Sequence, residues 1–194
     1  MGRSSGFTLW TLKRRENSMP RKANPYNYVK TFLADLDNRL MSGIRPVYIE
    51  KDEERNAYYV CVFKQQENGK EAPVAFYTIP AKEMEDYLQS NGWFDLTGFK
   101  PENSMKKLWD DLDSTDGYLV HTIKKDSRKT TILLSREERF GLSSITYIDP
   151  QLVKWINLNK YRIYCNGNTG LVRIYADNDN WERIAVIAPK YTKD

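Results

Sequence analysis

The sequence predicts an α+β fold built mainly from antiparallel sheet. Its short strand-like segments fall into two clusters, and turn-forming residues separate the neighbouring strands within each cluster. The helix-like segments are few, and they do not alternate regularly with single strands. At 194 residues the chain is long enough for one substantial core. We therefore expect two antiparallel strand clusters covered by three to four helices.

An amphipathic helix precedes the first strand cluster. Residues 25–40 carry apolar side chains three and four positions apart, which is typical of a helix with one buried face. Strand signals follow at residues 47–50, 57–65 and 73–79. Asn68-Gly69 is a hairpin signal between the last two strands. Pro80 then suits the first turn of a second helix, which Asn91-Gly92 ends.

The second half of the chain shows shorter elements. Ser135 and Glu138 have the spacing of a capping box, which marks the start of a helix. We expect helices at residues 101–112 and 135–141, strands at 117–123, 130–134 and 145–148, and a helical turn that Asp149-Pro150 begins. The clearest alternation comes last and predicts a three-stranded meander at residues 161–165, 171–176 and 183–188.

The surplus positive charge lies at the start of the chain. Residues 1–24 contain six lysines and arginines and one acid, whereas the formal net charge of the whole chain is +4. The remaining chain is therefore almost neutral and has no long-range field that would steer a polyanion. We predict a flexible basic arm at residues 1–24 and a single α+β domain at residues 25–194. Two alternatives for the arm are a transit peptide and a true start at Met19.

Chemically reactive residue types are few. Cys61 and Cys165 each lie in the middle of a strand-like run, which favours buried, reduced thiols over a disulfide or a metal cluster. His121 is the single histidine and shares a strand side with apolar residues, so we expect a hydrogen-bonded core residue. The sequence has no glycine-rich phosphate loop, nucleophile elbow or dinucleotide fingerprint. We therefore assign no catalytic residue, no metal ligand and no cofactor.

Strand alternation divides the last meander into two sides. One side is apolar and is expected to be core: Tyr161, Ile163, Cys165, Val172, Ile174, Ile184 and Val186. The other side, called here the Arg/Tyr face, carries Arg162, Tyr164, Arg173, Tyr175 and Arg183. Guanidinium groups hold phosphates and phenol rings stack on bases, so this face is a candidate site for single-stranded nucleic acid. The alternative is an ordinary solvated face with cross-strand Arg–Tyr pairs.

Two basic segments are candidates for further phosphate contacts. A predicted hairpin loop at residues 124–129 has one acid and four cations, Lys124, Lys125, Arg128 and Lys129. The arm adds Arg14 and Arg15, whose contacts would be mobile and sensitive to salt. A charged hairpin tip that only keeps the sheet edge soluble is the alternative interpretation.

One stretch resembles a known family. Residues 57–64 and 75–88 are similar to the strand, strand and helix core of restriction-endonuclease-like nucleases. The resemblance implies a magnesium site in which Asp52 or Glu50 matches the first acid and Lys64 matches the lysine. Val62 stands where that family has its second acid, so a magnesium ion bound here would lack one of its carboxylate ligands. Two interpretations follow. Either the protein is a non-cleaving relative of these nucleases, or the likeness is only that of any meander that enters a helix.

Three functional hypotheses arise from these patterns. The first is a non-catalytic nucleic-acid-interacting protein that uses the Arg/Tyr face, the basic loop and the arm. The second is a protein-interaction module, an inhibitor or assembly component, because tyrosine and arginine are also frequent interface anchors. The third is a divergent metal-dependent nuclease. No segment has the apolar length of a membrane span or a convincing secretory signal, so we expect a cytoplasmic protein without a membrane partner.

Overall fold

The structure is a computed structural model that describes residues 24–42, 47–65, 69, 71–92, 117–126, 131–135, 145–166, 168–177 and 182–190. The described part contains two α-helices and two antiparallel sheets, which confirms the predicted α+β class. The helices expected at residues 101–112 and 135–141 lie outside the described residues, apart from Ser135. The arm up to residue 23 also lies outside them.

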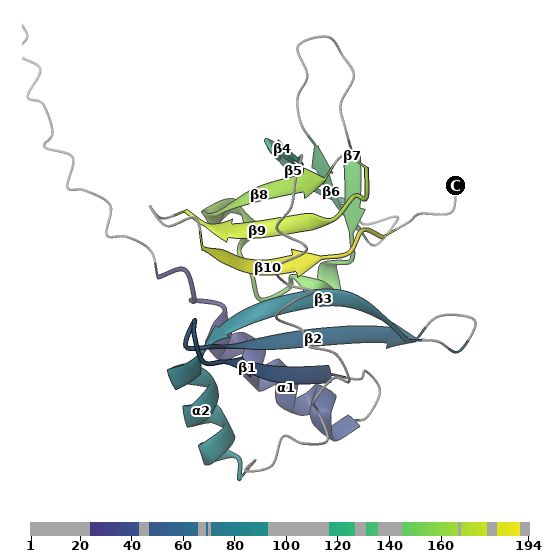
Figure 1. The fold of residues 1–194 in the computed structure, drawn as a ribbon. Helices are drawn as coiled ribbons and strands as arrows, with labels where there is room; N and C mark the ends of the chain where they lie inside the picture. Colours follow the sequence, from purple (N-terminus) through teal and green to yellow (C-terminus); the bar gives the residue numbers. More distant parts are fainter. Residues whose placement is uncertain are drawn as a thin grey trace, which may run out of the picture.

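Seven strands form the larger sheet (Figure 1). Their spatial order is β1 (Val47–Asp52), β2 (Ala57–Gln65), β3 (Glu71–Pro80), β10 (Arg183–Ile187), β9 (Val172–Ala176), β8 (Tyr161–Asn166) and β4 (Gly117–Leu119). Every neighbouring pair is antiparallel. The predicted first and last meanders therefore belong to one sheet, because β3 pairs with β10.

The smaller sheet contains β5 (Thr122–Asp126), β6 (Thr131–Ser135) and β7 (Ile145–Ile148). The prediction of one strand at residues 117–123 is wrong, because the chain leaves the larger sheet after Leu119. The amide of Val120 still donates to the carbonyl of Ile163 at 2.9 Å, whereas the amide of His121 donates to Ser135 at 3.0 Å. Leu119 and His121 are both exposed, so the strand side expected to be core is not buried here, and the predicted burial of His121 is also wrong.

Both α-helices lie at the β1–β3 end of the larger sheet in Figure 1. The first, α1 (Val29–Ser42), buries Phe32 and Leu36 with no exposed surface, as the spacing predicts. The second, α2 (Ala81–Ser90), begins directly after Pro80 and buries Met84 and Leu88. Two short 3₁₀-helices follow β7, namely η2 (Pro150–Leu152) and η3 (Leu158–Lys160).

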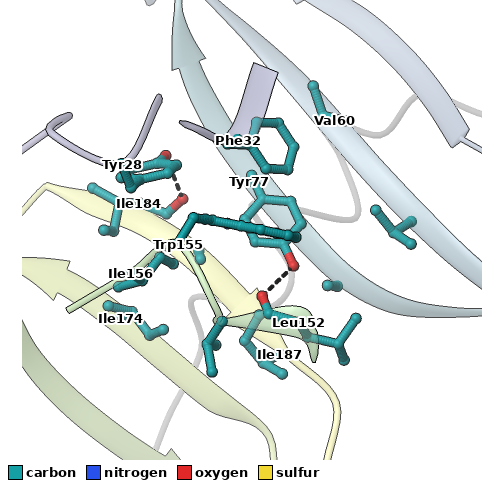
Figure 2. Close-up of a cluster of buried hydrophobic side chains, with 14 of the residues drawn as sticks. Tyr28, Phe32, Val60, Tyr77, Leu152, Trp155, Ile156, Ile174, Ile184 and Ile187 are labelled. Atoms are coloured by element: carbon teal, nitrogen blue, oxygen red, sulfur yellow. Dashed lines mark hydrogen bonds between the residues drawn. The ribbon is translucent and has the colours of Figure 1, made fainter. Parts of the chain in front are cut away.

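An aromatic cluster joins α1, the larger sheet and the segment after β7 (Figure 2). The ring of Phe32 lies 4.7 Å from Tyr77 and 5.1 Å from Trp155, measured between centroids. Tyr77 is fully buried, and its hydroxyl donates to the carbonyl of Leu152 at 2.6 Å. The Tyr28 hydroxyl donates to the carbonyl of Thr78 at 2.6 Å in the same way. Each phenol thus buries a large ring while its polar group has a partner.

The two sheets share this core. Ile132, Leu134 and Ile148 of the smaller sheet belong to the same buried cluster as Ile163 and Ile174 of the larger one. The chain after β10 also connects them, because the amide of Ala188 donates to Val74 at 2.9 Å and the amide of Lys190 donates to Tyr147 at 2.7 Å. Strands β8–β10 and β5–β7 therefore enclose a common interior.

One irregularity in β10 corrects the predicted core. The register between β9 and β10 shifts between Arg183 and Ala185, which is the mark of a β-bulge. Ile184 stays in the main core, as predicted, but Val186 lies on the opposite side of the sheet in a second cluster. The prediction for Val186 is wrong because the extra residue reverses the alternation after Ile184.

We expect Tyr77→Phe to lower the free energy of unfolding by about 1–3 kcal/mol, because it leaves the buried Leu152 carbonyl without this donor. Chemical denaturation followed by fluorescence measures the change. Tyr48→Phe is the control, since the half-buried Tyr48 ring packs against Phe63 on the other side of the sheet. Equal stability of wild type and Tyr77→Phe would contradict the proposed role of this hydroxyl.

Candidate functional site

The Arg/Tyr face exists as one side of the larger sheet. The strand register places Arg162 opposite Tyr175 and Tyr164 opposite Arg173. Arg183 also lies opposite Tyr175, on the neighbouring strand. The five residues therefore share one side of β8–β10, as their spacing predicts.

Two of the three arginines on this face are buried. Arg173 keeps 7% of its surface exposed and Arg183 keeps 8%. Both lie on interior strands of the larger sheet, because the pairing of β3 with β10 extends it beyond the last meander. Arg173 lies opposite Val186, which belongs to the second apolar cluster with Tyr59, Cys61 and Phe76. The expectation of an open face is therefore wrong at these two arginines.

The accessible part of the face is aromatic and electrically neutral. Tyr164 and Tyr175 are half-buried and contact each other edge to face, with ring centroids 5.7 Å apart and an interplanar angle of 89°. The Nε of Arg162 donates to Oδ1 of Asp177 at 2.5 Å, and both side chains are partly exposed. Leu119 lies opposite Tyr164 and is 37% exposed. We call these five residues the tyrosine patch.

The turn beside the tyrosine patch is well organised. Oδ1 of Asn166 accepts the amides of Asn168 at 2.9 Å and Thr169 at 2.8 Å, and Gly170 donates to the Asn166 carbonyl at 2.9 Å. Gly170 has φ +69°, which glycine adopts without strain. This turn fixes the β8–β9 register and thereby the relative position of Tyr164 and Tyr175.

The predicted basic loop is partly strand. Lys124 and Lys125 belong to β5, where they pair with Leu133 and Ile132, so the prediction that the loop begins at residue 124 is wrong. Both lysines are exposed. Arg128 and Lys129 lie outside the described residues, as do Arg14 and Arg15 of the arm.

The residues that match the nuclease pattern lie far apart. Asp52 pairs with Ala57 at one end of β2, whereas Lys64 pairs with Ala72 near the other end, about 20 Å away at the usual rise of a strand. Asp52 is 4% exposed. Glu50, the other match for the first acid, lies opposite Tyr59, also away from Lys64.

The hydrogen bonds of Asp52 define its role in the β1–β2 turn. Oδ1 of Asp52 accepts the amides of Glu54 at 3.1 Å and Arg55 at 3.3 Å, and Oδ2 accepts the Tyr59 hydroxyl at 2.9 Å. Burial, together with the bond to Asp52, raises the pKa of Tyr59 to about 12. Among the described residues, no group of three or more histidines, cysteines or acids is placed to hold a metal ion.

Both cysteines are free and buried, as predicted. Burial raises the pKa of the Cys61 thiol far above its ordinary value. Burial also raises the pKa of Cys165 to about 11, although hydrogen bonds with Thr146 and Tyr118 act in the opposite direction. The thiolate is the nucleophilic form, so neither cysteine is suited to nucleophilic catalysis near neutral pH.

The sequence patterns missed a cavity of about 300 Å³. Its walls come from β2, β3, the segment after β7 and the segment after β10: Phe63, Lys64, Val74, Asp149, Leu152, Ala188, Pro189 and Lys190. No sequence signal could have found it, because these four segments meet only in the folded chain.

Comparison with protein-family models, with curated proteins and with solved structures found no match to this chain. In the described part of the chain, neither helix combines the length and the apolar character that crossing a membrane requires.

We expect a disulfide reagent such as 5,5′-dithiobis(2-nitrobenzoate) to leave both cysteines unmodified in the native protein at about pH 8, below the raised thiol pKa values. As the pH rises toward 11, the Cys165 thiolate becomes populated and folding loses the stability gained from burying the neutral thiol. Unfolding in denaturant should release two reactive thiols. Stoichiometric labelling of the native protein at pH 8 would contradict the assigned burial.

Proposed function

We propose that this protein is a non-catalytic protein-interaction module that binds its partner through the tyrosine patch. The observation that carries the proposal is the neutral aromatic surface formed by Tyr164 and Tyr175 beside the Arg162–Asp177 ion pair. Tyrosine and arginine are enriched among the residues that dominate binding energy in protein interfaces. Interface cores are also depleted of unpaired charge.

Rigidity supports this proposal further. The two tyrosines lie on neighbouring, paired strands, and the Asn166 turn holds those strands together at one end. Binding would therefore order few additional side chains, which lowers the entropic cost of association. A tyrosine also offers a large contact area while it loses little rotamer freedom.

A nucleic-acid interface is less well supported at this face. Binding to single strands combines stacking platforms with cations that follow the phosphate backbone. Arg173 and Arg183 are buried, and Arg162 is already neutralised by Asp177. The face therefore offers rings but little accessible positive charge.

The exposed lysines of β5 favour nucleic-acid binding as a second candidate function. Lys124 and Lys125 are neighbours on a strand whose chain continues directly from β4, the strand that carries Leu119 of the tyrosine patch. Because neighbouring residues of a β-strand point to opposite faces of the sheet, a nucleic-acid strand that crossed the patch toward β5 would meet one of these two ammonium groups. This candidate requires binding that weakens steeply with salt.

Site-specific photo-crosslinking tests the leading proposal. We would place a benzoylphenylalanine at Tyr175 of the full chain in its native host and, as the matched control, at the exposed Lys82 of α2. We expect a discrete crosslinked species at Tyr175 that protease removes and nuclease leaves intact. A nuclease-sensitive species, or no species beyond that of the Lys82 control, would reject the assignment.

Oligonucleotide binding separates the two candidates. Fluorescence anisotropy with labelled single-stranded DNA and RNA, at about 50 and 200 mM salt, should show no binding by wild type if the tyrosine patch is a protein site. Binding that weakens steeply with salt and that Lys124→Ala/Lys125→Ala reduces would instead establish the second candidate. Lys30→Ala/Lys82→Ala, on α1 and α2, changes the net charge equally and is the control.

A further inference from the structure

The cavity near the end of the β2–β3 hairpin arises from two departures from regular sheet. The register of β2 and β3 shifts between Val62 and Phe63, so the β3 side gains one residue, Val74. Residues 188–190 follow β10, and the amide of Ala188 donates to the Val74 carbonyl whereas the amide of Lys190 donates to the Tyr147 carbonyl. These segments line a space of about 300 Å³.

The walls of this cavity are firmly placed. Leu152 belongs to η2 and is 5% exposed, and its carbonyl accepts the buried Tyr77 hydroxyl. Pro189 packs against Gly170 so closely that a Cβ added to Gly170 would lie 3.1 Å from the Pro189 Cβ. The cavity is thus preformed, as small-molecule sites usually are, and its volume is at the lower end of their range.

The lining combines an apolar surface with positive charge. Val74, Leu152, Ala188 and Pro189 supply the apolar walls, and Lys64 and Lys190 supply two ammonium groups. Asp149 is the one acid among the lining residues, and its Oδ1 already accepts the amide of Gln151 at 2.9 Å as the cap of η2. The lining therefore has a net positive charge beside an apolar surface.

We propose that this cavity binds a small organic carboxylate with an apolar body. The apolar body would lie against Val74, Leu152 and Pro189, which removes its surface from water. The carboxylate would lie toward Lys64 and Lys190, where ammonium groups donate charge-assisted hydrogen bonds. A neutral ligand of the same shape would gain the burial of its apolar body but not the charge-assisted hydrogen bonds.

Paired ligands test the charge requirement. We would titrate the full chain with 1-naphthoate and with 1-naphthamide, and follow the amide resonances of residues 63, 74, 188 and 190 by NMR. We expect the carboxylate to bind about tenfold more tightly than the amide, as hydrogen bonds to a charged group imply. Equal affinity for both ligands, or no shift with either, would overturn the proposal.

Two variants locate the site. Lys64→Met/Lys190→Met should abolish the preference for the carboxylate and leave the amide affinity unchanged, whereas Lys82→Met/Lys160→Met, outside the cavity, should change neither. Ala188→Phe should fill the cavity and remove binding of both ligands, provided that thermal unfolding shows a folded protein. A preference that survives in Lys64→Met/Lys190→Met would also overturn the proposal.

Discussion

The pairing of β3 with β10 is the contact on which the remaining architecture depends. It places Ala185 opposite Tyr77 and Val186 opposite Phe76, and so joins two meanders that lie about a hundred residues apart into one sheet. The aromatic cluster of Phe32, Tyr77 and Trp155 packs against this seam. Without it, β8–β10 would have an open edge, and the second apolar cluster would lose Val186.

The same pairing determines what the candidate site can do. It makes β10, which carries Arg183, an interior strand of a seven-stranded sheet beside β9, which carries Arg173, and both arginines are buried. Tyr164 on β8 and Tyr175 on β9 stay partly accessible. The surface that remains is aromatic and neutral, which suits a protein partner better than a phosphate backbone.

Local patterns predicted most of the elements, because their signals lie within a few residues. The strand at residues 145–148, the Asp149 cap and the helix that Pro80 begins all agree with the structure. Non-local features were not predictable in this way. The β3–β10 pairing, the bulge at Ile184 and the change of sheet at residues 120–121 depend on contacts between distant segments. Strand alternation therefore predicted correctly on which side of the sheet each arginine lies, but not whether it is buried. The cavity had no local sequence signal, because four separate segments form its walls.

Native-state hydrogen exchange measures the central seam most directly. NMR in increasing, sub-denaturing concentrations of denaturant reports the opening free energy of each amide. If the two meanders form one cooperative sheet, the protected amides of residues 75–77 and 185–187 will exchange only through global unfolding and with the same free energy. A lower opening free energy for β8–β10 than for β1–β3, with separate denaturant dependence, would contradict the account.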